Sequence, residues 1–176
     1  MKIKTTGMMT AIAAAFLALA LPACAQGGKQ AKSPARERGA EPGEWTQDYD
    51  AALALAKEKG LPILLAFSGS DWCPWCIMME KKVFDTPAWK EWAKKRVAMA
   101  FIDFPNDKGL VPADYGERNS TLAAKYGVEG LPTYILFASD GEKSLGELGA
   151  SRDATPEKFI ALVEALLKVG SPAEKQ

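Results

Sequence analysis

Two cysteines, Cys73 and Cys76, are the residues of this chain best suited to do chemistry. They are separated by two residues, and side chains three apart on a helix share a face, so a disulfide can form and reopen between them. Pro74 is typical of a first helical position, which places Cys73 at the helix N-terminus. Free N–H groups and the positive end of the helix dipole favour a thiolate there. Because the thiolate is the species that attacks disulfides, this spacing predicts a redox couple.

Histidine is absent from the 176 residues, which limits the chemistry further. Without it there is no Ser–His or Cys–His catalysis, no HExxH zinc site and no haem attachment at CxxCH. Lys plus Arg and Asp plus Glu number 22 each, so there is no basic excess to bind nucleic acid. We therefore expect no cofactor, no metal and no nucleic-acid partner.

The cysteine pair is expected between a buried strand and a helix. Residues 63–67 form a continuous apolar run that is typical of a central strand. Residues 68–70 then form a turn into a helix that extends to about residue 84. A further helix over residues 48–59, ended by Gly60, precedes the strand.

The rest of the chain predicts further helices and strands of one domain. The patterns favour helices over residues 88–96, over residues 117–126 and from Pro156 onward, strands over residues 97–104, 134–138 and 143–149, and a long surface loop over residues 105–116. Trp89 and Trp92 share one helical face and are expected to pack in the core.

The N-terminus has the layout of a secretory signal peptide. Lys2 and Lys4 precede an apolar stretch over residues 8–21, and a small-residue cleavage site ends at Ala25. We therefore expect residues 1–25 to direct export, to the periplasm or beyond. A lipoprotein anchored through Cys24 is the alternative, because the residues before it resemble a lipobox.

The remaining divisions follow from composition. Residues 26–43 carry charges, Gly and Pro without an apolar period, which predicts a flexible linker. Residues 44–170 form the expected folded domain, and residues 171–176 a disordered tail.

The order of elements and two motifs resemble the thioredoxin fold. Trp-Cys-x-x-Cys follows the first buried strand, and Gly-Val-Glu-Gly-Leu-Pro-Thr at residues 127–133 matches the family's pattern before a later strand. The resemblance covers about residues 45–170 and extends to exported bacterial members with Trp-Cys-x-Trp-Cys. It implies an α/β thioredoxin fold, with a central mixed β-sheet of about four to five strands flanked by helices on both faces.

The resemblance also implies roles for individual residues. Cys73 would be the attacking thiol and Cys76 the resolving one. Leu131 and Pro132 would be joined by a cis peptide bond, beside which the backbone pairs with an extended substrate segment. Trp72 and Trp75 flank the couple, and they either form an apolar platform for an unfolded substrate or pack on their own domain.

One position departs from the family. Thioredoxins keep a buried Asp on the strand before the motif, behind the resolving cysteine, and alignment places Ala66 there. Glu80 lies four residues after Cys76 and shares its helix face with both cysteines, so it is the candidate proton relay, acting through a water. A structural ion pair with Lys81, Lys82 or another surface cation is the alternative.

These residues predict an exported thiol–disulfide oxidoreductase that reduces or isomerises protein disulfides. The expected partners are protein substrates and a membrane electron donor, and the expected state is a monomer. Three alternatives stay open: a binding or chaperone-like module with a static disulfide, a disulfide-donating oxidase, and a metal protein. A metal site would need a dimer, because two cysteines supply half of a tetrahedral zinc site.

The direction of electron flow is the hardest inference. Cys-Pro-Trp-Cys is similar to the Cys-Pro-Tyr-Cys of glutaredoxins, whereas a proline after the first cysteine also occurs in bacterial oxidases. Asp71 is expected to bind N–H groups at the helix start and, as an anion, to oppose a thiolate at Cys73. Since a strong oxidant needs a highly stabilised thiolate, we expect a moderately reducing couple.

Overall fold

The computed structural model describes residues 1–2 and 33–170. The predicted tail, Cys24 and nearly all of the predicted signal peptide lie outside the described residues. Within residues 33–170, no helix is both long and apolar enough to cross a membrane.

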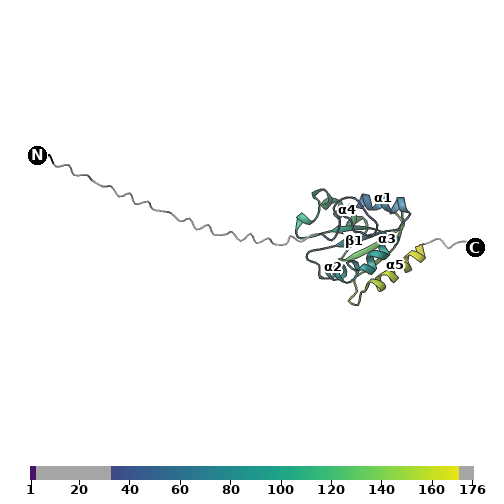
Figure 1. Ribbon diagram of the computed structural model, residues 1–176. Coiled ribbons are helices and arrows are strands. Elements are labelled where there is room, and N and C mark those ends of the chain that lie inside the picture. Colours follow the sequence, from purple (N-terminus) through teal and green to yellow (C-terminus); the bar gives the residue numbers. More distant parts are fainter. Residues whose placement is uncertain (3–32, 171–176) are drawn as a thin grey trace, which may run out of the picture. The chain divides into compact units, whose positions relative to one another are not determined.

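A four-stranded mixed sheet in the order β2-β1-β3-β4 forms the centre of the domain (Figure 1). Its strands are β1 (Ile63–Ser68), β2 (Ala98–Asp103), β3 (Thr133–Phe137) and β4 (Ser144–Gly149). β1 pairs in parallel with β2, and β3 runs antiparallel to both β1 and β4. All six residues of β1 are buried, which confirms the central strand expected from its apolar run.

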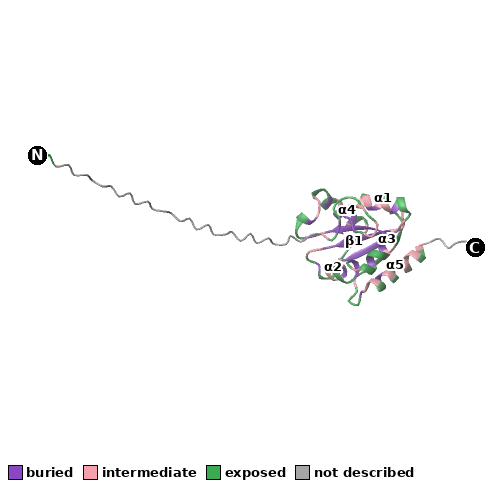
Figure 2. Cartoon of the chain, viewed as in Figure 1, coloured by how far each residue is buried: buried purple, intermediate pink, exposed green. Residues whose placement is uncertain are grey.

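Helices cover both faces of this sheet. They are α1 (Tyr49–Lys59), α2 (Pro74–Met79), α3 (Pro87–Arg96), α4 (Gly116–Lys125) and α5 (Pro156–Gly170). Successive side chains of β1 point to opposite faces. Leu64 and Ala66 join a core cluster with residues of α2, α3 and α5, whereas Leu65 and Phe67 join a second cluster with residues of α1 and α4. The buried strands therefore lie between helices whose outer faces are exposed (Figure 2), and the expected α/β thioredoxin architecture is confirmed.

Three short helical turns refine the expected boundaries. The helix that follows the cysteine pair continues from α2 as a π-helical turn, η1 (Glu80–Phe84), rather than as one α-helix. The expected surface loop over residues 105–116 contains two 3₁₀ turns, η2 (Lys108–Leu110) and η3 (Ala113–Tyr115).

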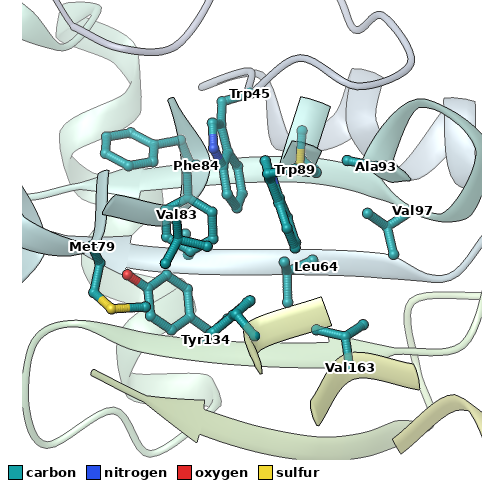
Figure 3. Close-up of a cluster of buried hydrophobic side chains, with 14 of the residues drawn as sticks. Trp45, Leu64, Met79, Val83, Phe84, Trp89, Ala93, Val97, Tyr134 and Val163 are labelled. Carbon is teal, nitrogen blue, oxygen red and sulfur yellow. The ribbon is translucent and has the colours of Figure 1, made fainter. Parts of the chain in front are cut away.

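Phe84, the last residue of η1, lies at the centre of an aromatic cluster (Figure 3). Its ring centroid lies 5.1–5.4 Å from four other aromatic rings, those of Trp45, Trp89, Tyr134 and Phe159. Trp89 is fully buried, as expected, and Trp92 is partly buried against it. The cluster fixes the end of the motif helix against the sheet.

Residues 33–43 differ from the flexible linker that we expected for 26–43. Ala35 is buried, the Arg36 N–H donates to the Trp45 carbonyl at 2.9 Å, and the Gln47 N–H donates back to the Arg36 carbonyl at 2.8 Å. Arg38 donates to Asp114 and to the Tyr115 hydroxyl, both at 2.9 Å. Backbone hydrogen bonds and the contacts of one guanidinium group hold this segment. Such contacts do not require a periodic pattern of apolar residues, so the sequence showed no sign of them.

Candidate active site

The cysteine pair lies where β1 ends and α2 begins. Ser68 closes the strand, and residues 69–72 form the turn in which the Cys73 N–H donates to the Gly69 carbonyl at 2.9 Å. The Trp72 ring packs directly on Gly69, and a Cβ at Gly69 would lie 2.6 Å from it. The turn therefore requires glycine at this position.

Cys73 and Cys76 form a disulfide, with Cα atoms 5.2 Å apart. Cys73 is the N-cap of α2, and its sulfur accepts the Cys76 N–H at 3.3 Å. The Cys76 sulfur accepts the Gly69 N–H at 3.5 Å. The two residues are 4% and 5% exposed, so accessibility does not distinguish them. Their positions distinguish them, because only Cys73 lies at the N-terminus of α2, where a thiolate is favoured.

The Leu131–Pro132 peptide bond is cis, as the motif implied, and it lies against the disulfide. The Leu131 carbonyl oxygen is 3.7 Å from the Cys73 sulfur. When Cys73 is reduced, this oxygen can accept its S–H, which favours the thiol, whereas the Cys76 N–H favours the thiolate. The two contacts act on Cys73 in opposite directions.

Trp72 and Trp75 expose apolar surface beside the disulfide. They are 47% and 40% exposed. The Trp72 indole N–H donates to the Phe104 carbonyl at 2.7 Å, so Trp72 packs on its own domain and is still half open to solvent. The Arg152 guanidinium lies 5.7 Å from the centre of a Trp75 ring. Trp72 therefore packs on its own domain, as the second alternative expected, while its exposed part leaves the first alternative, a platform for substrate, as a prediction.

Asp71 does not cap α2, contrary to expectation. Its two carboxylate oxygens accept the N–H groups of Asn106 and Asp107 at 2.9 and 2.8 Å. These bonds, above all the one from Asp107, lower the pKa of Asp71. Asp71 is therefore an anion that ties the loop after β2 to the turn before Cys73.

Glu80 lies in a cleft of about 210 Å³ that Cys76 also lines, together with Ser68, Ser70 and Phe101. This volume is large enough for several water molecules. Burial raises the pKa of Glu80 to about 7, with a further contribution from Asp85 and an opposing one from Lys90. The structure records no ion pair between Glu80 and Lys81 or Lys82 in the described residues.

Asp103, the last residue of β2, is a buried carboxylate that the sequence analysis missed. It is 2% exposed and accepts the Ser70 N–H at 3.0 Å and the Ser70 hydroxyl at 2.6 Å. Burial raises its pKa, and the bonds from Ser70 oppose that shift. Parallel strands end at the same edge of a sheet, so an acidic residue at the end of the strand beside β1 is expected near the cysteine pair. The sequence could therefore have identified Asp103 as a site residue.

A sequence model of the thioredoxin-like domain family matches residues 49–166. The chain belongs to this family. It is 33% identical over 156 residues to a disulfide bond reductase, DsbH, of Chlamydia pneumoniae, covering 87% of this chain and 92% of that protein. Among solved structures, a DsbH oxidoreductase is similar with a TM-score of 0.64 and 27% identity, over 78% of this chain and 87% of that one. A thioredoxin from Thermus thermophilus is similar with a TM-score of 0.53 and 26% identity, over 72% and 88% of the two chains.

This thioredoxin-like domain therefore carries a reversible sulfur pair at a helix N-terminus, an adjacent backbone carbonyl, the buried carboxyl group of Asp103 and the partly buried one of Glu80. Within residues 1–2 and 33–170, no three His, Cys, Asp or Glu side chains gather closely enough to hold a metal ion. The arrangement can exchange disulfides for dithiols, which is the chemistry of a protein-disulfide oxidoreductase.

The raised pKa of Glu80 predicts a pH dependence of stability. Between the ordinary carboxyl pKa of 4.5 and about 7, the folded state holds a proton that the unfolded state has lost, so the free energy of unfolding falls as pH rises through this window. We expect Glu80→Gln to remove about 2–3 kcal/mol of this fall, measured by urea unfolding of the oxidised protein at pH 4.5 and pH 8. Glu117→Gln, at an exposed position of α4, is the control. Equal slopes in wild type and Glu80→Gln would contradict the assignment.

Proposed function

We propose that this thioredoxin-like domain is an exported oxidoreductase that reduces or isomerises disulfides of protein substrates with the Cys73/Cys76 couple. The observation that carries the proposal is the Cys73–Cys76 disulfide at the N-terminus of α2, facing the Leu131 carbonyl and flanked by exposed Trp72 and Trp75. The relative from Chlamydia pneumoniae, named a disulfide bond reductase, supports this direction.

Cys73 and Cys76 act in sequence during reduction. The Cys73 thiolate attacks one substrate sulfur, a mixed disulfide forms, and the other substrate sulfur leaves as a thiolate that takes up a proton. Cys76 then loses its proton and attacks the Cys73 sulfur, which releases the second substrate thiol and leaves the Cys73–Cys76 disulfide. Two electrons and two protons pass from the protein to the substrate.

Substrate positioning falls to the residues around the disulfide. Leu131 and Pro132 offer backbone to an extended segment that carries the target disulfide. Trp72 and Trp75 offer apolar surface to the side chains of an unfolded chain. Disulfides of incompletely folded proteins are therefore the substrates that this surface fits.

Glu80 takes the proton that Cys76 must lose. Glu80 lines the same cleft as Cys76, which is large enough for water molecules between them, and its pKa of about 7 is close enough to that of a thiol for transfer near neutral pH. It replaces the buried Asp that thioredoxins keep on the strand before the motif, where this chain has the buried Ala66.

Reduction is favoured over oxidation by the groups around Cys73. The N–H of Cys76 favours the thiolate, but the Leu131 carbonyl and the anion of Asp71 oppose it. A strongly oxidising couple needs a highly stabilised thiolate, which this balance does not supply. In an exported location, the dithiol would be restored by a membrane electron donor.

Replacing one cysteine at a time tests their roles. We expect Cys76→Ser to accumulate mixed disulfides with substrates, because the second attack is lost, and Cys73→Ser to trap few or none. The measurement is non-reducing electrophoresis of the tagged proteins after acid quenching of cells. Wild type should also reduce insulin disulfides while both variants do not. Equal trapping by the two variants would contradict the assignment.

Removing the carboxyl of Glu80 tests the proton relay. We expect Glu80→Gln to slow insulin reduction by about one to two orders of magnitude near pH 7 and to remove a rise in rate with pH that is centred there. Glu117→Gln should behave as wild type. A rate that is the same in Glu80→Gln and wild type from pH 6 to 9 would refute the relay.

The redox state in cells tests the direction. Thiol trapping of growing cells should find Cys73 and Cys76 as the dithiol. Equilibration of the purified protein with glutathione should give a potential of about −200 to −270 mV, in the range of glutaredoxins and thioredoxins. If the pair is found as the disulfide with an oxidising potential, the oxidase alternative replaces this proposal. A closed disulfide that never turns over insulin would favour the binding module.

A further inference from the structure

Two clefts meet at Glu80. The smaller one, described above, also touches Cys76. The larger one, of about 690 Å³, lies between residues 34–45 and the elements η1 and α3. Pro34, Glu80 and Lys81 line both clefts. Pro34, an exposed residue, therefore lies at the boundary between the two clefts, beside Glu80.

The segment that carries Pro34 is firmly seated. We call residues 34–45 the N-terminal strap. At its end, Trp45 packs edge-on against Phe84 at 5.4 Å, and the next residue, Thr46, bridges to β2, where the Phe101 N–H donates to the Thr46 carbonyl at 2.7 Å. Gly43, at φ 81°, lies so close to α3 that a Cβ would be 2.9 Å from the Lys94 Cβ and 3.1 Å from the Lys90 carbonyl oxygen. The strap is thus fixed at one end by the aromatic cluster and along its length by close backbone contact.

The charged groups around Glu80 do not account for its raised pKa. Around Glu80, Asp85 raises its pKa and Lys90 lowers it, and the buried Tyr134 also interacts with it electrostatically. From the strap itself, Arg36 and Glu44 pair with each other at 2.6 Å and so present little net charge. The remaining charged groups around the larger cleft are Lys81, Glu91 and Lys94. The largest influence on the pKa of Glu80 is burial. Pro34 of the strap lines both clefts at Glu80.

We propose that the N-terminal strap is a positioning element of the redox site, which limits the access of water to Glu80 and thereby sets how readily Glu80 exchanges a proton with Cys76. The larger cleft is then the route by which Glu80 returns that proton to solvent. This inference rests on the proposed relay and adds a role for a segment outside the residues that the family model matches.

Two glycines of the strap offer a matched test. Gly39→Ala and Gly43→Ala both place a side chain at positive φ, 71° and 81°, but only the second forces a Cβ into α3. A third variant, Pro34→Gly, removes the ring that lines both clefts. The readout is the carboxyl infrared band of Glu80 in the oxidised full-length protein, assigned by difference from Glu80→Gln and followed across pH 4–9.

We expect the titration midpoint of Glu80 to fall by about one pH unit or more in Gly43→Ala and Pro34→Gly, towards that of a hydrated carboxyl, and to stay unchanged in Gly39→Ala. The pH at which insulin reduction rises should shift in parallel. Hydrogen exchange of residues 34–45 reports whether the strap has moved. A wild-type midpoint in both Gly43→Ala and Pro34→Gly overturns the proposal. If the midpoint falls but Glu80→Gln leaves the rate of reduction unchanged, the strap's effect stands and the relay fails.

Discussion

The carboxylate of Asp103 holds the turn on which the cysteine pair is built. It accepts two hydrogen bonds from Ser70, one from the backbone and one from the hydroxyl, and so ties the end of β2 to the residues that follow β1. With Ser70 fixed, the neighbouring Gly69 can donate to one sulfur and accept from the backbone of the other cysteine. A buried carboxylate is costly unless its oxygens are satisfied, and these bonds offset that cost. The geometry of the disulfide thus depends on a residue that belongs to a different strand.

Two carboxyl groups, those of Asp103 and Glu80, lie near the cysteine pair, and their surroundings suit them to different roles. Asp103 is directed at Ser70 and is already hydrogen-bonded, so its place is structural. The carboxyl group of Glu80 has no recorded hydrogen-bond partner among the described residues, and Glu80 lines a cleft shared with Cys76. A group that must pick up and release a proton needs this freedom, whereas a group that fixes a turn does not. Ala66, which aligns with the buried Asp of thioredoxins, is small and buried. In the proposed mechanism, Glu80 of the motif helix supplies the acid that the strand lacks.

Much of the fold was predictable because its signals are local. The apolar run of β1, the start of α5 at Pro156 and the Leu131–Pro132 motif each occupy a few consecutive residues, and all were confirmed. What the sequence concealed depends on partners far along the chain. Asp71 binds a loop 35 residues away, Asp103 binds a turn 33 residues away, and Arg38 reaches Tyr115 across 77 residues. The sequence predicted a linker over residues 33–43 because polar and backbone contacts of this kind leave no periodic pattern of apolar residues.

The aromatic cluster connects these distant parts to the redox site. Phe84 ends the π-helical turn that Glu80 begins, so the ring contacts of Phe84 fix where that turn lies. Trp45, from the N-terminal strap, packs on the same ring from one side, and Tyr134, which follows Pro132 and Thr133, packs on it from another. Close-packed rings transmit small displacements because few voids remain to absorb them. The strap, the strand that follows Pro132 and the turn that carries Glu80 therefore all pack on one side chain, Phe84, so the proposed proton site and the proposed substrate site share one core.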